Sequence, residues 1–267
     1  MRFSNLHTHT TFSDGKGTVR ENIESAIAKN MLSLGFSDHS FTACDTSYCM
    51  KLSDYERYCA EVRALAAEYR EKLPVYLGLE KDYYSEIDRG MFDYVIASVH
   101  YIVKGGVCYP IDHSRKQQED CIAEVFGGNI LDMAKCYYEM VAEHAALVKP
   151  DVIGHFDVLN KFSIMPEADD RYMRIAEDAM KEAFKHCPRF EINTGGISRG
   201  WRKDPYPSLY LLELLHLLGG EVVINSDSHH PDNLDFYFNE SAAILKKAGF
   251  ESYSVFNGKG FDKISLN

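Results

Sequence analysis

Short apolar runs alternate with longer segments of helical periodicity along the whole chain. The apolar runs predict seven buried strands, at residues 3–7, 32–37, 75–79, 94–99, 152–155, 190–193 and 222–225. An eighth run, at residues 253–256, is a candidate closing strand. The intervening segments predict helices at residues 18–30, 53–72, 130–148, 170–185, 208–218 and 240–248. This alternation predicts an α/β fold with parallel strands, either a barrel or an open doubly wound sheet.

Local signals support several of these boundaries. Thr18 and Glu21 have the spacing of a capping box, and Gly219 and Gly249 stand where C-cap glycines are expected. Residues 104–129 begin and end with paired glycines and predict an excursion that could lie over a site. Because there is no repeat, low-complexity tract or Pro/Ser-rich linker, we expect a single domain over residues 1–267.

Composition narrows the classes of partner. The formal net charge of −11 would repel nucleic acid, and no apolar run approaches the length needed to span a bilayer of roughly 30 Å. The N-terminal residues contain no signal-peptide core, so we expect a cytoplasmic protein with no membrane partner and leave its oligomeric state open. The irregularly spaced cysteines predict reduced thiols: Cys44, Cys49, Cys59, Cys108, Cys121, Cys136 and Cys187.

Metal-binding residue types recur where the predicted strands end. His7 and His9 are two residues apart, so both imidazoles face the same side of an extended strand. Each residue alone is more typical of a core, rim or solvated position, but active sites of α/β barrels assemble at the C-terminal ends of the strands. The joint pattern therefore predicts a metal site. Its candidate ligands are His7, His9, Asp14, His39, Glu80, His100, His155, Asp227 and His229.

The order of these residues resembles the motifs of the PHP (polymerase and histidinol phosphatase) superfamily. The matching segments are His7-Thr8-His9, Ser13-Asp14, Ser37-Asp38-His39, Gly78-Leu79-Glu80, Ser98-Val99-His100, Gly154-His155 and Asp227-Ser228-His229. Further segments resemble the monofunctional histidinol-phosphate phosphatase branch: Ile111-Asp112, Gly154-His155-Phe156-Asp157, Glu191-Ile192-Asn193-Thr194-Gly195 and Tyr206-Pro207-Ser208. The resemblance implies a distorted (β/α)₇ barrel of the PHP type with a trinuclear site at the strand C-terminal ends.

The resemblance also implies how the ligands are shared. One metal takes His7, His9, Glu80 and Asp227, the second shares Glu80 and adds His100 and His155, and the third takes Asp14, His39 and His229. Part of the family has a histidine where this chain has Asp14. Zinc, manganese and iron all suit this mixture of imidazoles and carboxylates. Three divalent ions and three carboxylates would leave about three positive charges to attract a phosphate monoester.

The activity implied by the resemblance is hydrolysis of L-histidinol phosphate to L-histidinol and phosphate in histidine biosynthesis. A metal-bridging hydroxide would attack phosphorus, with Glu80, Asp227 and His229 in catalytic roles. The acid that protonates the leaving group stays open among a metal-bound water, Asp227 and a spare histidine.

Contacts to the substrate are hypotheses from position. Arg199 is the first candidate for a bidentate phosphate contact and Arg202 the second, although either could equally be a solvated loop arginine. Asp112 and Tyr109, in the excursion, are candidates for recognising the imidazole and ammonium groups.

Three other functions fit parts of the pattern. The substrate could be another small phosphate ester or phosphotyrosine, with the same metal chemistry. A C–N hydrolase of the amidohydrolase type also begins with His-x-His, but the early Glu80 and the terminal Asp-x-His pair favour the PHP pattern. A structural metal site in a binding module would not need nine candidate ligands.

Overall fold

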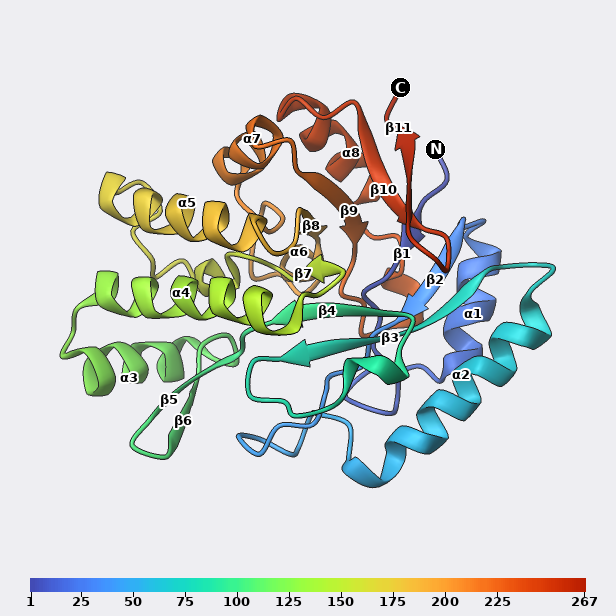
Figure 1. The fold of residues 1–267 in the computed structure, drawn as a ribbon, viewed down its shortest axis with the longest axis horizontal. Helices are drawn as coiled ribbons and strands as arrows, with labels where there is room; N and C mark the ends of the chain where they lie inside the picture. The colour runs from blue at the N-terminus through green and yellow to red at the C-terminus, as the bar shows by residue number, and fades with distance from the viewer.

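Seven parallel strands form a nearly closed barrel with helices around its outside (Figure 1). The computed structural model describes residues 1–267. The strand order is β1-β2-β3-β4-β7-β8-β9, and each neighbouring pair is parallel, which confirms the predicted barrel. The barrel strands are β1 (Ser4–Asn5), β2 (Ser33–Phe36), β3 (Val75–Asp82), β4 (Tyr94–Ser98), β7 (Val152–Ile153), β8 (Arg189–Asn193) and β9 (Glu221–Asn225).

The first and last strands, β1 and β9, do not pair with each other as a strand ladder. A single parallel bridge joins Thr8 to Ser228, just beyond the ends of β1 and β9. The backbone N–H of Leu6 also donates to Oδ1 of Asn225 at 2.8 Å. The seam of the barrel therefore lies between the segments that follow β1 and β9.

Eight α-helices connect and cover the strands. They are α1 (Val19–Ala28), α2 (Tyr55–Tyr69), α3 (Arg115–Phe126), α4 (Ile130–Val148), α5 (Asp170–Phe184), α6 (Gly195–Ser198), α7 (Leu209–Leu217) and α8 (Phe238–Lys247). The capping box is confirmed, since the Thr18 hydroxyl accepts from the Glu21 backbone and the Glu21 carboxylate accepts from the Thr18 backbone. Fifty-nine buried residues form the main core. No helix combines the length and the apolar composition needed to cross a membrane.

A second, smaller cluster includes side chains from several barrel strands. It contains Leu6, Tyr94, Ile96, Val152, Val223 and Phe256. The Tyr94 hydroxyl donates to the backbone oxygens of Leu6 at 2.5 Å and Phe36 at 3.0 Å. Gly78 makes room for this ring, because a Cβ there would lie 2.2 Å from Tyr94 Cζ. The strands are thus tied together around a packed aromatic ring.

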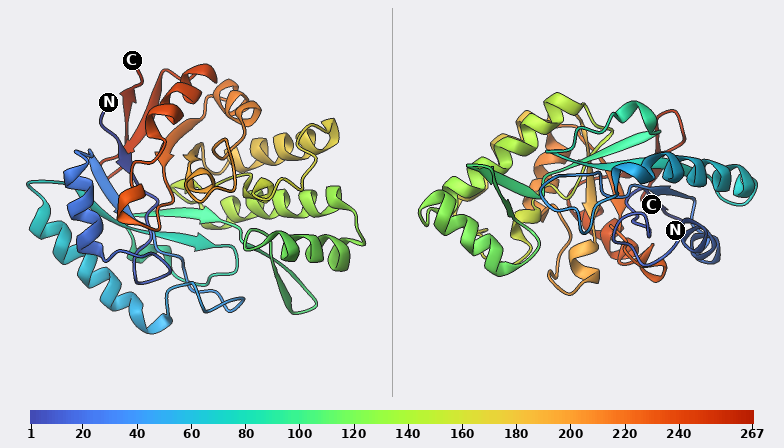
Figure 2. Two further views of the ribbon diagram at one scale, coloured as in Figure 1. Left: turned by 180° about the vertical axis from the view of Figure 1, so that it is seen from behind. Right: turned by 90° about the horizontal axis from the view of Figure 1, so that it is seen from below.

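Two predicted segments differ from expectation. Residues 253–256 belong to β10 (Ser252–Phe256), which pairs antiparallel with β11 (Phe261–Ser265), so the predicted closing strand is wrong. This hairpin lies beside β9, near both chain ends (Figure 2). The excursion contains the end of the hairpin of β5 (Tyr101–Lys104) and β6 (Val107–Pro110), followed by α3. The polar composition of α3 concealed it within the predicted loop.

The cysteine prediction is wrong for two of the seven residues. Cys44 and Cys108 form a disulfide with a Cα–Cα distance of 5.5 Å, whereas Cys49, Cys59, Cys121, Cys136 and Cys187 are free thiols. The bond joins the loop after β2 to the β5–β6 hairpin. Its partners are 64 residues apart in sequence, so only the folded hairpin brings them together.

Candidate metal centre

Glu80 lies among five histidines at the C-terminal end of the barrel. Oε1 of Glu80 is 3.4 Å from His7 Nε2, 3.4 Å from His100 Nε2 and 3.0 Å from His155 Nε2. Oε2 is 2.6 Å from His39 Nδ1 and 3.7 Å from His9 Nε2. The five imidazoles come from segments that follow β1, β2, β4 and β7, so the fold gathers them around one carboxylate.

The remaining three candidate ligands adjoin this group. Oδ1 of Asp14 is 3.2 Å from His229 Nε2, and Oδ1 of Asp227 is 3.1 Å from His9 Nε2. The ring of His9 stacks on that of His39 and is tilted against that of His229, with both centroid distances 4.2 Å. All nine predicted ligands therefore meet at one end of the barrel. Three sets of possible ligand atoms lie within 4.8 Å of one another: His9, Asp14, His39 and His229; His7, His9 and Glu80; and His39, Glu80 and His100.

The backbone that presents Asp227 is not a continuation of the strand. β9 ends at Asn225, and Asp227 has a φ of 50°, a left-handed conformation that aspartate adopts more readily than most residues. Gly195 leaves space opposite, because a Cβ there would lie 2.7 Å from both Asp227 Oδ2 and Arg199 Nη2. Arg199 consequently reaches Asp227, donating from Nη2 to Oδ2 at 2.9 Å.

Burial and neighbouring charges both shift the pKa values of the residues at this site. Burial alone would raise the pKa of Glu80, but the surrounding histidines lower it well below its usual range. Asp227 behaves similarly, because Arg199 and His7 lower its pKa against the effect of burial. For His9, burial and the neighbouring imidazoles of His39 and His229 lower the pKa to about 3. His9 is thus neutral at pH 7, which is the form that binds a metal.

The donor set fits divalent metal ions. Buried polar atoms normally have hydrogen-bond partners, yet His7 Nε2 and Asp14 Oδ1, which face other candidate ligands, form no hydrogen bond. These atoms belong to the same converging residues, and metal coordination would satisfy such nitrogens and oxygens. Imidazoles mixed with carboxylates are the ligands of zinc, manganese and iron sites.

Two buried carboxylates behind the ligands were not among the predicted site residues. Glu191 accepts from Nδ1 of His7 at 2.9 Å, and Asp82 contacts Nδ1 of His100 at 3.1 Å. Both residues are carboxylates within strands predicted or observed to be buried, which is unusual enough to be a signal. The sequence alone does not tell which histidine each carboxylate contacts.

A cavity of about 240 Å³ opens onto this centre. Six of the candidate ligands line it, and Tyr48, Tyr101, Asp112, Lys161 and Arg199 are among its other lining residues. Arg202 does not line it: this side chain pairs with Glu167 at 2.7 Å. Tyr109 also lies outside the lining, and its hydroxyl donates to Glu124.

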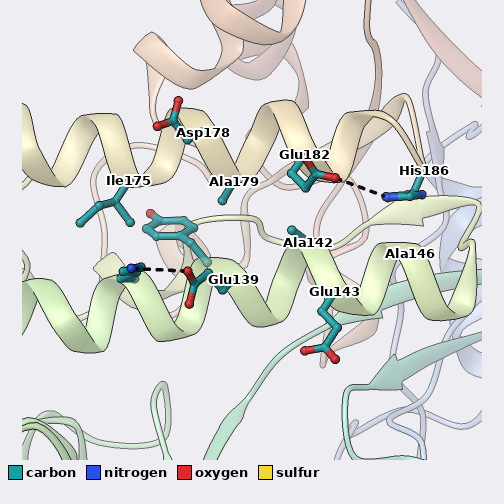
Figure 3. A pocket seen from close by; sticks show the side chains of 11 residues that line it. Glu139, Ala142, Glu143, Ala146, Ile175, Asp178, Ala179, Glu182 and His186 are labelled. Atoms are coloured by element: carbon teal, nitrogen blue, oxygen red, sulfur yellow. Dashed lines mark ion pairs between the residues drawn. The ribbon is translucent and has the colours of Figure 1, made fainter.

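A larger cavity of about 520 Å³ lies elsewhere, between α4 and α5 on the outside of the barrel (Figure 3). Its lining includes Ala142, Ala179 and the ion pairs Lys135–Glu139 and Glu182–His186. It contains none of the nine ligand residues, so the smaller cavity is the candidate active site.

The family of the chain follows from sequence comparison. Residues 5–195 match the family model described as PHP domain. This chain belongs to the PHP domain family. The resemblance of the ordered motifs is thereby confirmed, although the matched residues end before Asp227 and His229.

Curated relatives of this PHP protein extend over nearly its whole length. The "Probable histidinol-phosphatase" of Deinococcus radiodurans is 30% identical, over 91% of this chain and 92% of the relative. The histidinol-phosphatase of Lactococcus lactis subsp. lactis is 26% identical, over 98% of this chain and 97% of the relative.

Solved structures show the same PHP fold. The Lactococcus lactis histidinol phosphate phosphatase, complexed with zinc, L-histidinol and phosphate, has a TM-score of 0.71 and 20% identity, with 98% of this chain and 99% of that chain covered. HisK from Listeria monocytogenes has a TM-score of 0.78 and 22% identity, with 89% and 99% covered. At these identities the likeness establishes the fold.

Proposed function

We propose that this PHP protein is a metal-dependent phosphomonoesterase that hydrolyses L-histidinol phosphate to L-histidinol and phosphate. The observation that carries the proposal is the convergence of nine imidazole and carboxylate side chains at one end of a PHP barrel, six of which line one cavity. Relatives over the full length are named histidinol-phosphatases, which supports this ester over other phosphate esters and over C–N hydrolysis.

We assign the nine residues to three divalent ions, with Glu80 shared between two of them. His39 is 2.6 Å from Glu80 as well as 3.7 Å from Asp14, so its imidazole lies at the boundary between groups. When bound, divalent metals supply Lewis-acid activation of water and neutralise charge on the phosphate oxygens. Zinc is our first choice because the Lactococcus lactis protein was crystallised with it.

The side chains around the cavity would orient the ester. Arg199 is held by Asp227 and by a 3.0 Å contact with Nδ1 of His229, which directs its guanidinium along the cavity wall. It is the proposed phosphate contact, and the position of Arg202 beside Glu167 removes the second candidate from this cavity. Asp112 would receive the substrate ammonium, since Lys161 and nearby histidines lower its pKa against burial and keep it ionised.

Phosphate release from L-histidinol phosphate tests this function. The purified zinc-loaded protein should release phosphate rapidly, lose activity with chelator, and recover it when zinc is restored. p-Nitrophenyl phosphate and sugar and nucleotide monophosphates serve as competitors. Much faster turnover of another ester would move the substrate assignment elsewhere, and full activity in chelator would refute the metal mechanism.

A further inference from the structure

Glu191 on β8 is completely buried and does not line the cavity of the candidate active site. Its Oε2 accepts from His7 Nδ1 at 2.9 Å and from Asn225 Nδ2 at 2.8 Å. Its Oε1 accepts from the His155 backbone N–H at 2.7 Å and from Asn193 Nδ2 at 2.7 Å. Glu191 therefore bonds two candidate ligand residues that are 148 positions apart in the chain.

The two asparagines are held with their NH₂ groups toward Glu191. Oδ1 of Asn225 accepts from the Leu6 backbone at 2.8 Å, and Oδ1 of Asn193 accepts from the Gly195 backbone at 2.8 Å. Rotating either amide would break one of these bonds and place two oxygens against each other. With donors on all sides, Glu191 is an acceptor only.

These hydrogen bonds determine which ring nitrogen carries the hydrogen when His7 is neutral. A carboxylate that only accepts requires a proton on His7 Nδ1, so the lone pair of the neutral ring is on Nε2. Nε2 has no hydrogen-bond partner and faces Oε1 of Glu80 at 3.4 Å and Oδ1 of Asp227 at 3.7 Å. The ring is consequently oriented for coordination before any ion arrives.

We propose that Glu191 is a positioning residue that fixes the tautomer and orientation of His7, and through them sets the metal affinity of the centre. The proposal rests on metal binding by the proposed active site and is independent of which ester is hydrolysed. The backbone bond to His155 extends the same support to a second ligand residue. Glu191 itself touches neither metal-facing atoms nor substrate.

Glutamine at this position provides a sharp test because it has nearly the same shape. Its NH₂ group would face at least two of the four donors that Glu191 accepts from. The His155 backbone N–H can only donate, so the amide oxygen stays on that side and the NH₂ group takes the side of His7. His7 could then bond to the NH₂ group only through an unprotonated Nδ1, which moves its hydrogen to Nε2 and blocks coordination. We expect Glu191→Gln to bind zinc about 10- to 100-fold more weakly than the wild type, the range for lost partners of metal-ligating histidines.

The measurement is zinc affinity by competition with a chromophoric chelator, after circular dichroism has verified the fold. Glu221→Gln is the matched control: it alters a strand carboxylate that is only partly buried and that contacts Arg189 and no candidate ligand. Histidine ring ¹⁵N spectra of the zinc-loaded protein should assign the Nδ1–H form to His7 in the wild type and not in Glu191→Gln. If the glutamine variant does not fold, Glu191→Asp keeps the charge but withdraws it from His7 and should weaken zinc binding too.

A double-mutant comparison separates positioning from general damage. In a His7→Ala background, Glu191→Gln should change zinc affinity by no more than about twofold, because its target is gone. Equal losses in both backgrounds, or unchanged zinc affinity in the single variant, would overturn the role of Glu191. A wild-type protein that binds no zinc at all would instead overturn the proposed function.

Discussion

The carboxylate of Glu80 is the most informative single group to remove. Five histidine nitrogens lie between 2.6 and 3.7 Å from its two oxygens, whereas the Asp227 carboxylate has three such neighbours. Glu80→Gln keeps the volume and removes the negative charge. Removing a residue that only hydrogen-bonds to a metal ligand costs about 10- to 100-fold in metal affinity. Because Glu80 is itself a proposed ligand, we expect Glu80→Gln to weaken zinc binding by more than about 100-fold, equivalent to about 2.7 kcal/mol.

The same substitution has a separate effect on the metal-free protein. Against the effect of burial, Glu80 raises the pKa of His39 and His100, and Glu191 and Glu80 together raise that of His7, so these imidazoles depend on Glu80 for charge compensation. Removing one partner of a buried charge pair costs about 3–5 kcal/mol, and Glu80→Gln should lose stability of this order in chelator. Urea unfolding at pH 7 with chelator measures this loss.

Zinc content after dialysis and phosphate release from L-histidinol phosphate complete the assay. Glu139→Gln, an exposed substitution on α4, is the control and should match the wild type in both. Wild-type zinc content and turnover in Glu80→Gln would refute the central position that we assign to this carboxylate.

Three further predictions concern the cavity, the packing and the opposite end of the barrel. Arg199→Lys keeps the charge but loses the bidentate geometry, so kcat/KM for phosphate release should fall by about 10²- to 10³-fold with zinc content unchanged; an unchanged kcat/KM would remove Arg199 from the site. Gly78→Ala places a Cβ 2.2 Å from Tyr94 Cζ and should destabilise the protein by about 1–3 kcal/mol in urea unfolding, whereas wild-type stability would show that the ring can move. Arg189 lowers the pKa of Glu221 against burial, so their bond stabilises the fold above an unfolded-state pKa of about 4.3 and loses its effect as pH falls through the folded-state pKa. Glu221→Gln should therefore cost about 1 kcal/mol at pH 7 and less below about pH 4; a cost that does not depend on pH would contradict this.

Hydrophobic patterning predicted the parallel strands, because strands covered on both faces are continuous apolar runs, whereas the choice of a barrel came from the resemblance to the PHP superfamily. Residues 94–99 and 222–225 therefore identified β4 and β9 within two residues. Residues 253–256 are equally apolar, yet β10 pairs with β11 and not with the barrel. An apolar run predicts that a strand is buried, but it does not predict which other strand will pair with it.

The convergence of the candidate ligands was predictable because nearly all of them follow barrel strands, and the ends of parallel strands collect at one end of a barrel. Arg199 and Arg202 show where this reasoning stops. Both are in the same loop region, but one reaches Asp227 in the cavity and the other pairs with Glu167 outside it. Side-chain direction in a loop depends on tertiary contacts, such as the space left by Gly195 beside Asp227.

Because the candidate ligands lie on both sides of the seam between β1 and β9, metal binding would also stabilise the closure of the barrel. His7 and His9 follow the first barrel strand, while Asp227 and His229 follow the last, and only the Thr8–Ser228 bridge joins these segments in register. An ion shared across this line would close a loop of more than two hundred residues and stabilise only the closed form. Metal removal should therefore loosen the N-terminal segment first, detectable as faster amide exchange at His9 and Ser228 than in the strands opposite.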